Sequence, residues 1–171
     1  MNREQTLRRR IKRLTGLFIV VLVLSGATAI PLATELNWLV KFTGAQQMVG
    51  SPASTNAPDW AIWLINVQEA LRSSGIKYPF LFYGTDWLAF GHFVIAISFI
   101  GALRDPIRNR WLFDFGLMAC ALVIPYALVF GGWRGIPIWW RLLDGSFGVF
   151  GFIPLWFCRQ WTGELESRVK N

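Results

Sequence analysis

Cysteine and histidine are scarce in this chain, which has two cysteines and one histidine among 171 residues. Cys120 and Cys158 show neither the spacing of a C-x-x-C redox pair nor that of a disulfide framework, and small apolar packing is their simplest role. A catalytic zinc needs several protein ligands, and a bis-histidine haem needs a histidine pair. The sequence therefore excludes these centres, and it predicts no catalytic residues and no metal ligands.

Acidic residues are also few, with 10 Asp and Glu against 17 Lys and Arg and a net charge of +7. A nucleic-acid-binding protein would carry such charge on a folded basic face interleaved with aromatic side chains. Instead, six cations precede the first long apolar run: Arg3, Arg8, Arg9, Arg10, Lys12 and Arg13. This placement is typical of the flank of a membrane-inserted helix. We therefore expect a lipid bilayer as a partner and no nucleic acid.

Four long apolar runs dominate the chain, in which 54% of the residues are hydrophobic. They cover residues 14–33, 84–103, 111–130 and 138–158. A helix rises about 1.5 Å per residue, so each run matches a hydrocarbon core of about 30 Å. The sequence predicts an all-α, polytopic membrane protein in which four transmembrane helices form a single membrane domain.

The cations between the runs indicate an orientation. Most of them fall in the basic tail 1–13, in the short connection after residue 103 and in the tail 159–171. Because cytoplasmic segments carry an excess of Lys and Arg, we expect both termini to be cytoplasmic. The motif Ala27-Thr28-Ala29 resembles a signal-peptide cleavage site, but the apolar run continues to Ala33. We therefore expect an uncleaved anchor.

The longest predicted connection, residues 34–83, faces outward in this topology. It contains two amphipathic stretches, one on each side of a linker rich in Gly, Ser, Pro and Asn. We expect short helices here that lie on the outer membrane surface or cap the bundle.

His92 is an ionisable residue about eight positions into the second run, which makes it a candidate functional residue. Small residues, Ala89 and Ala96, lie one turn to either side, so its face is expected to meet another helix. The simplest role is an interhelical hydrogen bond. A lone imidazole could also contact a quinone, ligate a haem or chlorophyll-type pigment, or relay protons.

Charged residues near the outer ends of the runs could join His92 in a polar pocket. Asp86 begins the second run, Asp144 lies within the fourth, and Arg141 and Arg134 precede Asp144. A ligand pocket is one interpretation, and ion contacts that fasten helix ends are the simpler one. Asp114 has less weight, because an acid is favoured near a helix N-terminus and Arg110 stands four residues before it.

Tryptophans and small residues indicate contact surfaces. Seven of the 10 tryptophans belong to the outer half, which fits a cap in the lipid headgroups or docking to a partner subunit. Small residues let membrane helices approach each other closely. The predicted partner or membrane-interface contacts are Trp38, Trp60, Trp63, Trp133, Trp139, Trp140, Gly91, Ala96, Gly145 and Gly148.

Three stretches carry a resemblance to a protein family: Gly84–His92, Leu103–Asn109 and Asp144–Gly148. They resemble segments of small bacterial four-span integral membrane proteins of uncharacterised function. The resemblance covers the second to fourth runs. It implies a similar architecture and a location in the bacterial inner membrane.

Three functions stay open from the sequence. The favoured one is a non-catalytic accessory or scaffold subunit of a larger membrane assembly, with other membrane subunits as partners. The first alternative is a quinone- or tetrapyrrole-binding protein with a pocket around His92. The second is a small transporter or channel, although the inner halves of the runs offer few polar residues.

Overall fold

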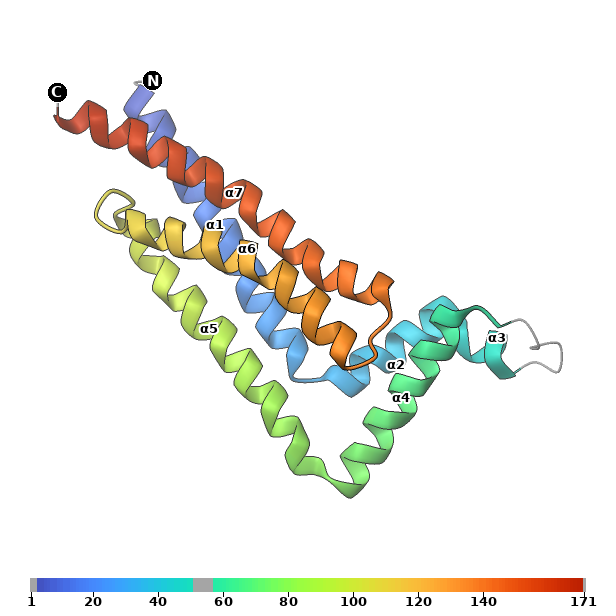
Figure 1. The fold of residues 1–171 in the computed structure, drawn as a ribbon. Helices are drawn as coiled ribbons and strands as arrows, with labels where there is room; N and C mark the ends of the chain where they lie inside the picture. Colours follow the sequence, from blue (N-terminus) through green and yellow to red (C-terminus); the bar gives the residue numbers. More distant parts are fainter. Residues whose placement is uncertain (1–2, 51–56, 171) are drawn as a thin grey trace. The chain divides into compact units, whose positions relative to one another are not determined.

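The computed structural model describes residues 3–50 and 57–170, and every regular element in these ranges is helical (Figure 1). The predicted all-α fold is confirmed for this part of the chain. The chain forms two compact units, one made of Met1–Leu22 with Val94–Asn171 and the other of Val23–Phe93. The boundary between the units crosses two long helices, one near the N-terminus and one in the middle of the chain.

The elements follow one another with short breaks. They are α1 (Arg3–Ala29), α2 (Leu32–Thr43), α3 (Ala45–Gly50), α4 (Asp59–Lys77), the 3-10 helix η2 (Pro79–Phe82), α5 (Tyr83–Arg104), α6 (Arg110–Trp133) and α7 (Ile138–Lys170). Most of the predicted linker before α4 lies outside the described residues.

Three stretches of the described chain are long and apolar enough to cross a membrane: Arg3–Ala29, Pro79–Arg104 and Arg110–Trp133. They correspond to the first three predicted spans. The fourth run lies in α7, which is long enough to cross a membrane but is not among the helices that are also apolar enough. The physical reason is its composition, because Arg141, Asp144 and several glycines and tryptophans interrupt its aliphatic residues.

The first predicted span ends earlier than the sequence suggested. Its apolar run reaches Ala33, but α1 ends at Ala29, and Leu32 already belongs to α2. Proline explains the break, because Pro31 has no N–H to continue the helix and disfavours a helical conformation at Ile30.

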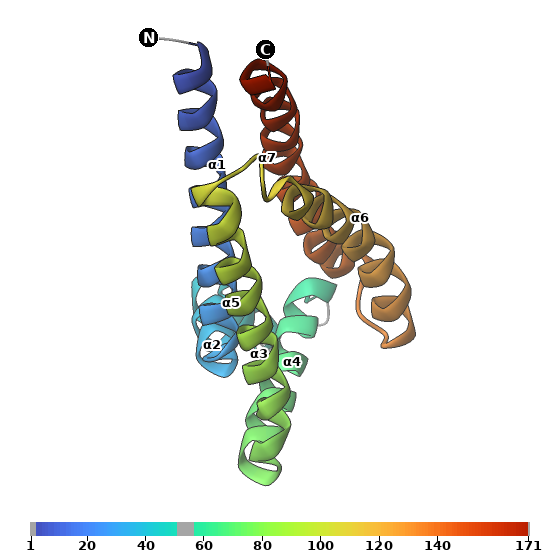
Figure 2. The same ribbon diagram turned by 90° about the vertical axis from the view of Figure 1, so that its left-hand side faces the viewer.

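The first unit contains a hairpin of α6 and α7, which run side by side in both views (Figure 1, Figure 2). Gly116 of α6 packs beneath Leu155 and Phe99, where an added Cβ would lie 2.7 Å and 3.0 Å from their side chains. Phe99, Phe113 and Leu155 are buried at the centre of the apolar core. These aromatic and aliphatic contacts hold the last part of α5 against α6 and α7.

The described parts of the two predicted terminal tails belong to the helices α1 and α7, which pack together within the first unit. Leu7 and Ile11 of α1 share a buried cluster with Leu165 of α7. Nearby, the Thr15 hydroxyl and the Cys158 thiol lie 3.8 Å apart, within hydrogen-bonding distance. Apolar residues continue at helical spacing beyond each run in the sequence. Both helices therefore extend past the runs, and their apolar faces pack against each other.

The second unit is built around α2 and α4. Leu36 and Val40 of α2 are buried, as are Ala61 and Leu64 of α4. Gly44 ends α2 with a φ of 69°, a conformation that glycine adopts without strain. Helices therefore occupy the predicted outer connection, while their position on a membrane surface stays a prediction.

Candidate functional sites

Gly26 allows α1 and α5 to approach closely beside the only histidine. A Cβ on Gly26 would lie 2.9 Å from the His92 Cβ, 2.9 Å from the Phe93 ring and 3.0 Å from the Ala89 carbonyl oxygen. The His92 face of α5 thus meets another helix. Sequence reasoning missed Gly26, although a glycine within a long apolar run was a signal that could have drawn attention to it.

The His92 imidazole forms its hydrogen bond within α5. Its Nδ1 lies 2.8 Å from the Leu88 carbonyl oxygen, in place of the interhelical bond that the sequence suggested. A backbone carbonyl can only accept, so Nδ1 donates this hydrogen bond, and Nε2 is the ring atom left for any further contact. The quinone, haem and chlorophyll-type hypotheses stay predictions.

Arg141 of α7 binds the C-terminal end of α6 at one end of the hairpin. Its guanidinium Nη1 donates a hydrogen bond of 3.1 Å to the Leu128 carbonyl oxygen, and its side chain lies over Gly131 and Gly132. A cation at this position complements the negative C-terminal end of α6. No ion pair joins Arg141 to Asp144 among the described residues. Arg141 thus fastens a helix end through a carbonyl.

The remaining charged candidates belong to different units of the chain. Asp86 is exposed in the first turn of α5, where the helix dipole favours an acid, and it belongs to the second unit with His92. Asp144 is half-buried in α7, and Arg134 is exposed beyond α6; both belong to the first unit. A shared pocket of these residues with His92 stays a prediction.

Ion pairs gather where both termini lie. The Arg3 guanidinium makes two hydrogen bonds to the Glu164 carboxylate, of 3.0 and 2.9 Å. Arg3 thereby holds the pKa of Glu164 below its usual range. Arg110 pairs with Glu166 of α7 at 2.9 Å, and Arg159 pairs with Asp114. Asp114 thus finds its partner on α7, because the hairpin brings Arg159 closer than the Arg110 of its own helix.

The predicted contact residues behave differently from one another. Trp38 and Trp133 are strongly exposed, Trp139 is at the edge of exposure, and Trp60, Trp63 and Trp140 are half-buried. Ala96 is buried. Gly148 packs against the Cys120 carbonyl oxygen of α6, whereas Gly91 and Gly145 have open space where a Cβ would stand. Only some of the small residues predicted from the sequence therefore lie at a close helix contact.

A polar groove in the second unit had no sequence signal. The cavity has a volume of about 330 Å³ and is lined by Ala33, Leu36, Asn37, Gln46, Gln68, Glu69, Leu71 and Arg72. The Gln68 amide donates to the Asn37 side-chain oxygen at 2.7 Å. Arg72 makes two hydrogen bonds to Glu69 and lowers the pKa of that carboxyl. The groove thus offers amide groups and a closed ion pair.

No group of three or more His, Cys, Asp or Glu side chains that could hold a metal ion occurs within residues 3–50 and 57–170. Comparison of the chain with protein-family models, curated proteins and solved structures found no match. The resemblance to small bacterial four-span proteins therefore stays a prediction.

Proposed function

We propose that this protein is an accessory subunit of a membrane assembly and that α2 docks onto an integral membrane subunit through Trp38 and Phe42. These two residues are one helical turn apart and therefore lie on the same face. Their side chains are 74% and 96% exposed. This uncovered aromatic pair is the single observation that carries the proposal.

The other face of α2 is already occupied. Leu36 and Val40, on the side of the helix away from Trp38 and Phe42, are buried within the second unit. This helix of 12 residues carries apolar side chains on two sides, and after one side packs against α4 the side with Trp38 and Phe42 stays uncovered. Trp and other aromatic residues are common anchors at protein interfaces, because each buries a large area with few rotatable bonds. An apolar surface on a partner subunit would cover Trp38 and Phe42.

The partner is tested with a photoreactive aromatic residue at position 38, activated in native membranes. A discrete adduct with one membrane protein is expected, and the same probe at the exposed Phe147 should give mainly lipid adducts. Lipid adducts alone from position 38 would contradict docking. A quinone or pigment extracted from the purified protein would instead favour the His92 hypothesis.

A matched pair of double variants measures the strength of the contact. Trp38→Ala/Phe42→Ala is expected to reduce partner retention during purification by roughly tenfold or more per residue, as for interface anchors. The control, Phe147→Ala/Phe150→Ala, removes two exposed aromatic side chains from α7 and should retain the partner. Equal retention by both variants would contradict the proposal.

We further propose the complete topology: α7 is a fourth span, both termini are cytoplasmic, and the membrane is the bacterial inner membrane. The packing of Gly148 against the α6 backbone supports a pair of spans, since small residues favour close contact between membrane helices. The cations at the ends of α1 and α7 support the orientation.

Single cysteines test this topology. Cysteines placed at residue 2 and residue 171, in a chain with Cys120 and Cys158 replaced by alanine, should resist a membrane-impermeant thiol reagent in intact cells. A cysteine at position 134 should react. Labelling of one terminus with protection of the other would exclude an even number of spans.

A further inference from the structure

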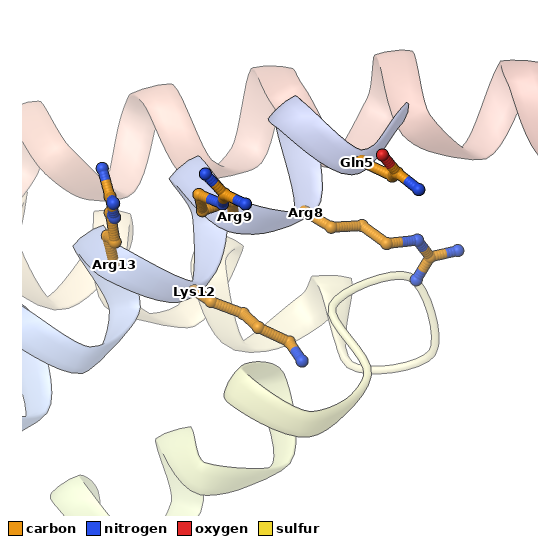
Figure 3. A pocket seen from close by; sticks show the side chains of 5 residues that line it. All are labelled: Gln5, Arg8, Arg9, Lys12 and Arg13. Carbon is orange, nitrogen blue, oxygen red and sulfur yellow. The ribbon is translucent and has the colours of Figure 1, made fainter. Parts of the chain in front are cut away.

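We propose that the basic face of α1 binds the phosphate headgroup of an anionic phospholipid. A concavity of about 470 Å³ lies on this face and is lined by Gln5, Arg8, Arg9, Lys12 and Arg13 (Figure 3). Figure 3 shows Arg8 and Lys12 extending to one side of the helix and Arg9 and Arg13 to the other. A phosphate held between them would meet guanidinium and ammonium donors from more than one direction.

Packing fixes the direction of this face. Leu7 and Ile11 are fully buried in the cluster that includes Leu165 of α7. Gln5, Arg9 and Lys12 lie on the opposite side of the same helical turns. The α1–α7 contact therefore turns Arg9 and Lys12 away from α7, in an orientation that a flexible basic tail would not have.

Nearby acids neutralise few of these cations. Glu4 pairs with Arg8 at 2.9 Å. Glu164 is engaged by Arg3 and by Arg168. No acidic side chain in the described ranges lies within salt-bridge distance of Arg9, Lys12 or Arg13. These three cations are therefore available to pair with an external anion.

The position along α1 favours a lipid over a soluble anion. The helix has 27 residues, so it is about 40 Å long and exceeds a hydrocarbon core of about 30 Å. Its apolar part begins at Leu14, directly after the basic face. Once α1 is inserted, Arg9, Lys12 and Arg13 lie at the level of the headgroups, where a membrane presents phosphates.

Native mass spectrometry of the full-length protein in neutral detergent tests this site. The probes are phosphatidylglycerol, phosphatidylcholine with the same acyl chains, and glycerol 3-phosphate as a phosphate without a lipid anchor. Phosphatidylglycerol is expected to bind at least about tenfold more tightly than phosphatidylcholine. Glycerol 3-phosphate at the same concentration should not displace it. Equal affinity for the two lipids would overturn the proposal, and displacement would assign the site to a soluble phosphate.

Charge-matched variants locate the binding. Arg9→Gln/Lys12→Gln should weaken phosphatidylglycerol binding by about 30-fold, as for the loss of two cations near a membrane surface. Lys41→Gln/Lys77→Gln removes the same charge from exposed positions of the second unit and should leave the affinity unchanged. Equal effects of both variants would contradict a site on α1.

A measurement on the unaltered protein covers the case of a misfolded variant. Raising the salt concentration should weaken phosphatidylglycerol binding steeply and phosphatidylcholine binding little, because exposed charges are screened. Parallel salt dependence for the two lipids would overturn the proposal.

Discussion

Gly148→Ala is expected to destabilise the α6–α7 hairpin by about 1–3 kcal/mol, the usual cost of overpacking a well-packed contact. The added Cβ would overlap the Cys120 carbonyl oxygen and lie 2.6 Å from a methyl carbon of Val123 and 3.1 Å from Ile124 Cγ1. A backbone oxygen cannot move aside as a side chain can. The two helices must therefore separate along part of their length.

Gly145→Ala is the matched control for this variant. Gly145 lies one turn earlier in α7 and has open space where the Cβ would stand. Alanine favours a helix over glycine by up to about 1 kcal/mol, so this variant should be unchanged or slightly more stable. Thermal unfolding in detergent measures both variants. Equal unfolding temperatures for Gly148→Ala and Gly145→Ala would show that α6 and α7 do not touch at Gly148.

Gly26→Ala is expected to have a comparable cost at the α1–α5 contact. Its Cβ would lie 2.9 Å from the His92 Cβ and 3.0 Å from the Ala89 carbonyl oxygen. Both atoms are held by the α5 backbone, so the strain cannot be relieved by a rotamer change. We expect a loss of about 1–3 kcal/mol and a changed environment of the His92 ring.

Gly16→Ala provides the control on the same helix. The nearest atom to its added Cβ is the end of the Leu103 side chain at 4.0 Å, an ordinary contact. Chemical unfolding gives the stability of each variant, and the imidazole NMR signal of the only histidine reports on its surroundings. A His92 signal that Gly26→Ala leaves unshifted would contradict the close approach of α1 to this residue.

Length and hydropathy determined where the long helices of the described chain lie, because a helix that satisfies its own backbone groups needs no information from the rest of the fold. The connection after α5 was equally readable. Pro106 and the polar residues around it predict a break, and α5 ends at Arg104 while α6 begins at Arg110. Asn109 closes this connection by donating from Nδ2 to the carbonyl oxygens of Gly101 and Asp105, each at 3.0 Å.

The partners of the polar side chains could not be predicted from the sequence in the same way. Spacing along one helix suggested Arg110 with Asp114, and the hairpin instead offers each of them a partner on α7. His92 was expected to bond to another helix, yet its ring contacts the Leu88 carbonyl oxygen of its own helix. Such choices depend on distances between helices, which local sequence does not encode.

The sequence by itself determined the helical class, the approximate positions of the apolar helices and the concentration of cations beside the first of them. Each of these follows from local composition and from the fixed rise of a helix. Only the tertiary structure decided which glycines lie at helix contacts, which faces stay uncovered and where the terminal segments pack. Gly145 and Gly148 make the difference plain: they are one turn apart on α7, but only Gly148 meets the backbone of α6.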